Sequence, residues 1–209
     1  MTIAVHDLRA YTHDKRRTVD DRPYGGGPGM VLKPEPIFDA VEDLKARFCR
    51  EPKARRSHRC QTILMSPQGE RLTSALAKRL SRMRHLIVLC GHYEGVDERV
   101  RLGLVDRSIS IGDYVLTGGE LPAMVLIDTV ARYIPGVIGH AEATREESFA
   151  AGWLEYPQYT RPPVFRSMAV PEVLQSGDHG AIARWRRLQS VARTVAHRPD
   201  LMKKNGRSS

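Results

Sequence analysis

The pattern of apolar and polar positions contains three short apolar runs, at residues 62–65, 86–90 and 108–111. Short runs bounded by turn residues are typical of strands buried in a parallel sheet. Between the first two runs, residues 73–83 show helical spacing of apolar side chains, with basic side chains on the remaining surface. The alternation predicts a β-α-β unit and an α/β fold class with a parallel sheet.

Two further helices are predicted on the two sides of this unit. One is expected at residues 37–48, after a cluster of glycines and prolines, and the other at residues 121–133, where Pro135 and Gly136 stop it. Residues 45–59 are dense in Lys, Arg and His and show little apolar periodicity. We interpret them as a solvated surface insertion, with RNA contact as the less favoured alternative.

The composition changes after residue 138. Residues 139–155 are polar and aperiodic, which predicts an inter-domain linker. Residues 156–209 begin with a proline-rich extended segment and continue into an amphipathic helix. The sequence therefore divides into an α/β domain at residues 1–138, a linker, and a small, mainly helical C-terminal domain. We expect four apolar side chains of the last helix to face inward: Ile182, Trp185, Leu188 and Val191.

The chain of 209 residues is basic, with 33 Lys and Arg against 24 Asp and Glu, a formal net charge of +9 and a pI of about 9.8. Attraction to phosphates is long-ranged and independent of sequence, so this charge favours a polyanionic partner. Charge alone fits a soluble basic protein without such a partner equally well. Because four arginines lie on the other faces of the last helix, we favour nucleic-acid contact there: Arg184, Arg186, Arg187 and Arg193.

The apolar runs and the cysteine spacing also predict the cellular compartment of the protein and whether it has a metal site. No apolar run reaches the roughly 18 residues that cross a bilayer, and the N-terminus has no signal-peptide pattern, so we expect a cytoplasmic protein without membrane contact. Cys49, Cys60 and Cys90 form no C-x-x-C pair and are expected to be reduced thiols. Cys49, His58 and Cys60 match no zinc spacing, so no metal site is predicted.

Ligands of parallel sheets bind at the carboxyl ends of the strands, which directs attention to the loops at residues 66–69, 91–95 and 112–120. The chain contains no G-x-G-x-x-G fingerprint and no Gly-Lys pair, which excludes the usual dinucleotide and triphosphate sites. In the third loop, Thr117 and Glu120 have the spacing of a capping box, which would leave two glycines in the first helical turn.

Such a glycine turn lets backbone amides approach a flat adenine and a ribose closely. The alternative is a tight, capped turn without a ligand, which is the commoner case for one loop alone. Three glycine-bearing loops at one sheet edge favour a binding site.

Three segments carry a resemblance to a known family. They are VDDRPYGGGPGM at residues 19–30, CGHYEGVDER at 90–99 and SIGDYVLTGGELP at 110–122. They resemble the tRNA (guanine-N1) methyltransferase family, and the similarity extends through residues 132–139 and into the C-terminal part, so that it covers nearly the whole chain.

This resemblance implies a trefoil-knot α/β methyltransferase domain that binds S-adenosylmethionine and methylates N1 of the guanosine immediately 3′ of the tRNA anticodon. It also implies a homodimer in which the cofactor loops come from one subunit, while the linker and C-terminal domain of the other help to hold tRNA. The family further implies Mg²⁺ dependence, although no clustered ligand motif supports a site. The residues that would hold the cofactor in a bent form are Leu64, Met65, Ser66, Pro67, Gly91, Tyr93, Glu94, Ile111, Gly112, Asp113, Tyr114, Val115, Leu116, Gly118 and Gly119.

The reaction chemistry identifies the remaining roles. Guanine N1 carries a weakly acidic proton, so its methylation requires a base, and a cation near O6 stabilises the negative charge that develops there. Glu147 aligns with the family's catalytic carboxylate and Arg132 with its catalytic arginine. The family's usual base is aspartate, which is one methylene shorter than Glu147, and the alternative is that Glu146 shares the role. By the same alignment, the target guanosine is contacted by Asp20, Gly29 and Ser148.

The sequence departs from the family at its N-terminus, because the family's first strand and helix are missing and residues 3–8 correspond to its second strand. A start codon assigned too far downstream, or a truncated chain, is the preferred explanation. Two alternatives to the active enzyme remain: a truncated or inactive relative that binds tRNA, and another knotted RNA methyltransferase.

Overall fold

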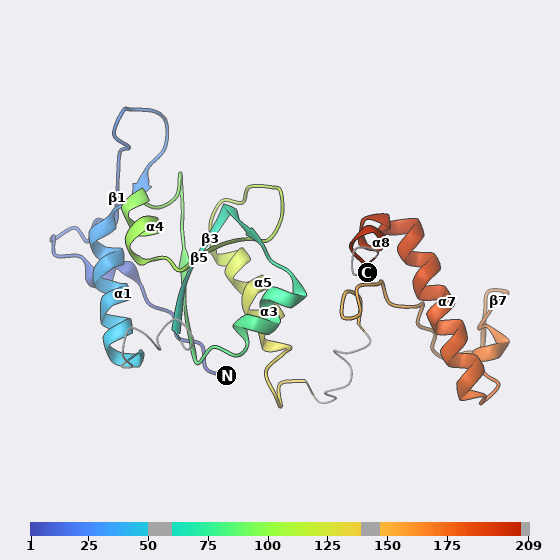
Figure 1. Cartoon of the computed structure of the whole chain (residues 1–209). Helices are drawn as coiled ribbons and strands as arrows, with labels where there is room; N and C mark the ends of the chain where they lie inside the picture. The colour runs from blue at the N-terminus through green and yellow to red at the C-terminus, as the bar shows by residue number, and fades with distance from the viewer. Residues whose placement is uncertain (50–59, 139–146, 206–209) are drawn as a thin grey trace. The chain divides into compact units, whose positions relative to one another are not determined.

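The computed structural model describes residues 1–49, 60–138 and 147–205 (Figure 1). The chain forms two compact units, at residues 1–138 and 139–209. No helix among the described residues is long and apolar enough to cross a membrane.

The first unit contains a parallel three-stranded sheet, as predicted. Strand β3 (Cys60–Arg71) lies in the centre, between β4 (His85–Cys90) and β5 (Arg107–Ser110). β3 is longer than expected because it pairs with β5 twice: Met65 and Glu70 both register with Ile109. The predicted loop at residues 66–69 is therefore a bulge within β3.

Among the described residues, four helices accompany the sheet: α1 (Pro34–Phe48), α3 (Ser74–Leu80), α4 (Glu98–Leu104) and α5 (Glu120–Ala131). Three of them match the predicted helices, and the Thr73 hydroxyl caps α3 by accepting the Leu76 N–H. The sequence did not predict α4, because seven residues are too few for a helical period to show. Asp97 caps it by accepting the Arg99 N–H.

The helices cover both faces of the sheet (Figure 1). In β4 the side chains of Leu86 and Val88 join the hydrophobic cluster with α3 and α5, whereas Ile87 and Leu89 join the cluster with α1 and α4. Successive residues of a strand point to opposite faces, so an apolar run without polar positions is what a doubly covered strand requires.

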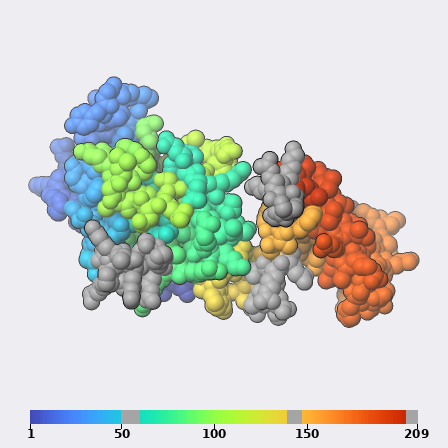
Figure 2. All heavy atoms as spheres, in the orientation of Figure 1, coloured from blue at the N-terminus to red at the C-terminus, as the bar shows by residue number. Residues whose placement is uncertain are grey.

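The strand expected at residues 3–8 is not formed. These residues precede a 3-10 turn, η1 (Leu8–Tyr11), and the side chain of Val5 is 94% exposed. No described strand pairs with this segment, and a strand without a hydrogen-bonded neighbour has no partner for its backbone groups. The first pairing of the chain is instead the short hairpin of β1 (Asp20–Asp21) and β2 (Val31–Leu32). Its glycine-rich loop lies at the surface of the unit (Figure 2).

Two of the three cysteines are not reduced, contrary to prediction. Cys49 follows the last residue of α1, Cys60 opens β3, and their Cα atoms lie 6.1 Å apart in a disulfide bond. The spacing of Cys49 and Cys60 in the sequence did not predict a disulfide, because only the packing of α1 beside the sheet brings the two cysteines together. Cys90 remains a thiol. Residues 50–59 of the predicted surface insertion, with His58, lie outside the described residues, and residues 45–48 belong to α1.

The second unit is built on one long helix. It contains β6 (Val164–Phe165), β7 (Met168–Ala169), the 3-10 turn η2 (Glu172–Leu174), α7 (His179–His197) and α8 (Pro199–Asn205). The Asp178 carboxylate accepts the Ala181 N–H at the start of α7. The long amphipathic helix predicted for this region is confirmed.

Two details of the predicted helix faces are wrong. Leu188 is 69% exposed rather than inward, and Arg186 is half-buried, with its guanidinium 4.7 Å from the centre of the Tyr156 ring. The packed face of α7 follows a spacing of four, through Ile182, Arg186, Ser190 and Thr194, of which Thr194 is fully buried. Position 188 is about 200° around the helix from position 186, so it points to solvent.

Candidate functional site

Two of the predicted loops join at the carboxyl end of the sheet. The Gly119 N–H donates to the Gly91 carbonyl at 2.7 Å, and the Nδ1 atom of His92 lies 2.7 Å from the Thr117 carbonyl oxygen. His92 and Gly118 also form an isolated antiparallel bridge. The loop after β4 is therefore attached to the segment that leads into α5.

This attachment replaces the predicted capping box. α5 begins at Glu120 with Gly119 as its N-cap, and no side chain caps the helix. Thr117 and Gly118 precede the helix because their backbone pairs with His92. Gly119 approaches the end of β4 closely: a Cβ atom there would lie 2.7 Å from Cys90 Cα and 2.9 Å from Gly91 N. Only glycine fits this contact without displacement of backbone.

The bulge of β3 packs against β5 by a second close approach. A Cβ atom on Gly69 would lie 2.4 Å from the backbone nitrogen of Ile109. The Leu72 N–H then donates to the Ser110 carbonyl at 2.7 Å. Of the predicted cofactor residues in this segment, Leu64 and Met65 are buried in the core, Ser66 is half-buried and Pro67 is exposed.

The loop after β5 starts as a fixed turn and continues as an exposed apolar segment. The Ser110 hydroxyl donates to the Gly112 carbonyl and accepts the Gly112 N–H, at 2.9 and 3.1 Å. The Tyr114 ring lies against Gly112, where a Cβ atom would overlap it. Side chains of this loop that are exposed, and so available to a ligand, are Asp113, Tyr114, Val115 and Leu116.

The hairpin of β1 and β2 adjoins the same loops. The Glu94 N–H donates to the Met30 carbonyl at 3.1 Å, and a Cβ atom on Gly29 would meet the Glu94 side chain at 2.5 Å. The structure thus brings Gly29, a predicted substrate residue, beside Glu94, a predicted cofactor residue. Asp20 lies on β1, in register with Leu32. Tyr93, in the same loop as Glu94, is 56% exposed and takes a positive φ of 56°.

The two predicted catalytic residues lie on different units. Arg132 follows the last residue of α5 in the first unit and is exposed. Glu147 and Ser148 lie at the start of the described part of the second unit, where both are half-buried. Glu146, the alternative base, lies outside the described residues.

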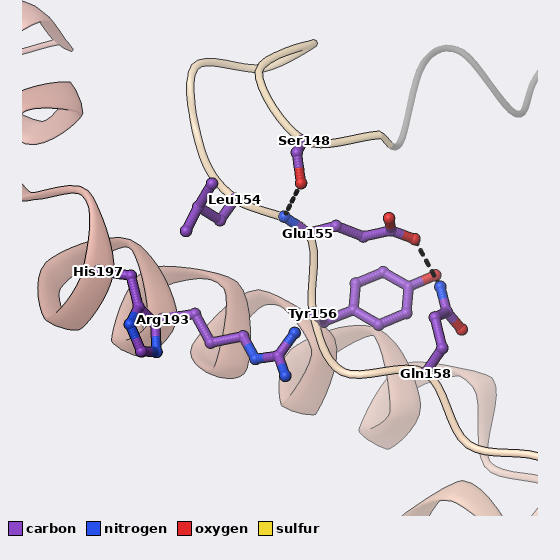
Figure 3. A pocket seen from close by; sticks show the side chains of 7 residues that line it. All are labelled: Ser148, Leu154, Glu155, Tyr156, Gln158, Arg193 and His197. Carbon is purple, nitrogen blue, oxygen red and sulfur yellow. Dashed lines mark hydrogen bonds between the residues drawn. The ribbon is translucent and has the colours of Figure 1, made fainter.

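Glu147 and Ser148 belong to a closed turn. The Glu147 carbonyl accepts the Ala150 N–H at 3.0 Å, and the Ser148 hydroxyl accepts the Glu155 N–H at 3.0 Å. Figure 3 shows the second of these bonds at an open pocket. The pocket is lined by Ser148, Leu154, Glu155, Tyr156, Gln158, Arg193 and His197.

Comparison with known proteins shows to which family the chain belongs. The family model described as "tRNA (Guanine-1)-methyltransferase TrmD" matches residues 1–204. The chain belongs to this family.

Curated relatives of the tRNA (guanine-1)-methyltransferase family match most of the chain. A protein of Moorella thermoacetica is 60% identical over 198 residues, which cover 94% of this chain and 76% of the relative. A protein of Dictyoglomus turgidum is 54% identical over 97% of this chain and 78% of its own length. One of Bacillus subtilis is 52% identical over 95% and 79%. All three are named tRNA (guanine-N(1)-)-methyltransferase.

His92 was not among the site residues predicted from the sequence of this tRNA (guanine-1)-methyltransferase family member. It lies inside a segment that carried the resemblance, but no single-residue signal marked it. Its ring stacks on Tyr93 with centroids 4.6 Å apart, while its Nδ1 atom contacts the next loop. His92 therefore joins the loop after β4 to the loop after β5, and this contact is seen only in the folded chain.

The Cys90 thiol immediately precedes these loops and gives a pH-dependent prediction. Burial raises the pKa of Cys90, and the nearby Glu120 carboxylate raises it further. Less thiolate is present at a given pH, so alkylation by iodoacetamide at pH 8 should be slower than for an ordinary thiol. Mass spectrometry at timed intervals measures the rate of Cys90 alkylation. The Glu120→Gln variant should be alkylated faster than the parent protein. Parent reactivity equal to that of free cysteine would contradict this assignment.

Proposed function

We propose that the chain transfers the methyl group of S-adenosylmethionine to N1 of the guanosine immediately 3′ of the tRNA anticodon. The observation that carries the proposal is the match of the family model to residues 1–204, together with relatives of that name at 52–60% identity. The joined loops at the carboxyl end of the sheet provide a place for the donor, as open α/β sheets generally do.

The residues at this edge fit a nucleoside-type donor. In the loop after β4, Gly91 and Gly95 carry no side chain, and in the loop after β5, Tyr114, Val115 and Leu116 present exposed apolar surface. We propose that the donor is held by the residues of the three loops that the resemblance assigns. When bound, S-adenosylmethionine supplies an activated methyl group on a sulfonium.

Side chains of the protein accept the proton of guanine N1 and stabilise the negative charge on O6. Glu147 accepts the proton from guanine N1, and Arg132 stabilises the negative charge that then spreads to O6. Asp20, Gly29 and Ser148 orient the guanosine, so that N1 faces the methyl carbon. Among the described residues, no group of three or more His, Cys, Asp or Glu side chains could hold a metal ion. The Mg²⁺ dependence that the family resemblance implies stays a prediction.

The remaining family features belong to the same proposal. Residues 1–138 form the knotted, S-adenosylmethionine-binding domain, residues 139–155 the linker with the base, and residues 156–209 the tRNA-binding domain. The protein acts as a cytoplasmic homodimer whose active site combines both subunits. Exposed arginines of α7 support RNA contact by the second unit: Arg184, Arg187 and Arg193.

A methyl-transfer assay tests the proposed function. Purified protein is incubated with methyl-labelled S-adenosylmethionine and tRNA transcripts that carry guanosine or adenosine immediately 3′ of the anticodon. We expect label in the guanosine transcript alone, recovered as N1-methylguanosine by mass spectrometry of the nucleosides. Retention of tRNA on a filter without label would instead support an inactive tRNA-binding relative. Label in another nucleoside would support a different RNA methyltransferase.

A further inference from the structure

The turn that carries Glu147 is held to α7 by partly buried hydrogen bonds. Thr194 is the one buried residue of α7, with no exposed surface. Its hydroxyl accepts the Leu154 N–H at 2.9 Å and donates to the Ser190 carbonyl at 2.7 Å. The Ser190 hydroxyl in turn donates to the Leu154 carbonyl. Two side chains of α7 therefore hold both backbone groups of Leu154.

The fastening extends from Leu154 back to Glu147 through the turn itself. The Phe149 N–H donates to the Trp153 carbonyl at 2.7 Å, and the Gly152 N–H donates to the Phe149 carbonyl at 3.2 Å. The bonds from Ala150 to Glu147 and from Glu155 to Ser148 close the turn on both sides. Rotation of the Leu154 backbone would therefore move the segment that bears Glu147 and Ser148.

The conformation of the turn needs this support. Phe149 takes a positive φ of 75°, which L side chains rarely adopt unless the surroundings hold them there. The Arg198 guanidinium lies 5.5 Å from the centre of the Phe149 ring, and the Arg198 N–H donates to the Thr194 carbonyl at 2.8 Å. The residue that follows α7 thus also contacts the turn, and its backbone is hydrogen-bonded to Thr194.

We propose that Thr194 is a positioning residue for methyl transfer, which sets the orientation of the Glu147 turn through the backbone of Leu154. The inference rests on the proposed function, because it assigns Thr194 a role only through the base on that turn. Loss of the hydroxyl leaves the Leu154 N–H without its acceptor inside the unit, and a small displacement of a catalytic group is enough to slow a reaction greatly.

The test compares Thr194→Val, which keeps the shape but removes the hydroxyl, with Thr194→Ser, which keeps the hydroxyl. In the full-length protein we expect Thr194→Val to lower kcat between about tenfold and a hundredfold. The KM for S-adenosylmethionine should stay unchanged, because the donor loops lie in the other unit. Thr194→Ser should recover most of kcat. Ser190→Ala, which removes only the bond to the Leu154 carbonyl, provides a second variant should Thr194→Val fail to fold.

A matched control separates positioning from general destabilisation. Ile182→Ala removes half-buried surface at the opposite end of α7 and should lower the unfolding temperature while it leaves kcat near the parent value. The proposal is overturned if folded Thr194→Val, or folded Ser190→Ala where Thr194→Val does not fold, keeps the parent kcat. It is also overturned if Ile182→Ala loses kcat to the same extent. A parent protein that transfers no methyl group would instead refute the proposed function.

Discussion

Replacement of Gly119 by alanine should weaken donor binding at least tenfold and destabilise the first unit. The new Cβ atom would lie 2.7 Å from Cys90 Cα, 2.9 Å from Gly91 N and 3.1 Å from the Cys90 carbonyl carbon, all of which are backbone atoms that cannot rotate away. The φ of −81° is ordinary for alanine, so the cost arises from overlap and not from backbone strain. Overpacking of this kind typically costs about 1–3 kcal/mol. Displacement would also break the bond from Gly119 to Gly91 that joins the two loops.

Calorimetric titration with S-adenosylhomocysteine and thermal unfolding measure the two effects of Gly119→Ala. We expect at least a tenfold loss of affinity, which corresponds to about 1.4 kcal/mol, and a lower unfolding temperature. Gly91→Ala is the steric control for stability, because the atom nearest to its Cβ would be Val96 Cγ1 at an ordinary 3.6 Å. Parent affinity and parent stability in Gly119→Ala would show that the close approach is not needed for the site.

Replacement of Glu147 by glutamine should abolish methyl transfer without loss of donor affinity. Glutamine keeps the size of the side chain but cannot accept the N1 proton, and general-base catalysis typically contributes about 10²–10⁴-fold to a rate. Single-turnover transfer of labelled methyl to tRNA measures the chemical step, and calorimetry with the donor measures binding.

Two companion variants sharpen this test. Glu146→Gln should keep most of the activity if Glu147 alone is the base, and Glu147→Asp should retain measurable transfer because aspartate is the residue that the family usually has there. Normal transfer by Glu147→Gln combined with loss in Glu146→Gln would move the role to Glu146.

The sequence predicted those parts of the fold that local pattern controls. Apolar runs marked all three strands of the sheet, because strands covered on both faces must be apolar on both, as Ile87 and Val88 show. The helices with several turns were also predicted, whereas the seven-residue α4 was too short to show a period. The carboxyl ends of the strands directed attention to the loops that the structure joins.

The errors have a common cause, which is contact between segments distant in sequence. The spacing of Thr117 and Glu120 favoured a capping box, but backbone pairing with His92 holds Thr117 outside the helix. Leu188 was expected to face inward because it is apolar, but its side chain is exposed. Thr194 is buried in α7 instead, because its hydroxyl accepts the backbone N–H of Leu154. The disulfide of Cys49 with Cys60 likewise depends on the packing of α1 beside the sheet. The proposed catalytic residues were predicted from the family resemblance, because a lone glutamate such as Glu147 carries no local signal.

The central claim is that the glycine-bearing loops at the carboxyl end of the sheet bind the methyl donor. Isothermal titration of the folded protein with S-adenosylmethionine and with its demethylated product, S-adenosylhomocysteine, tests this most directly. We predict saturable binding of both compounds, one molecule per chain at the most, with competition between them. Absence of heat from either compound, at several temperatures and with protein whose cooperative unfolding shows it to be folded, would contradict the claim.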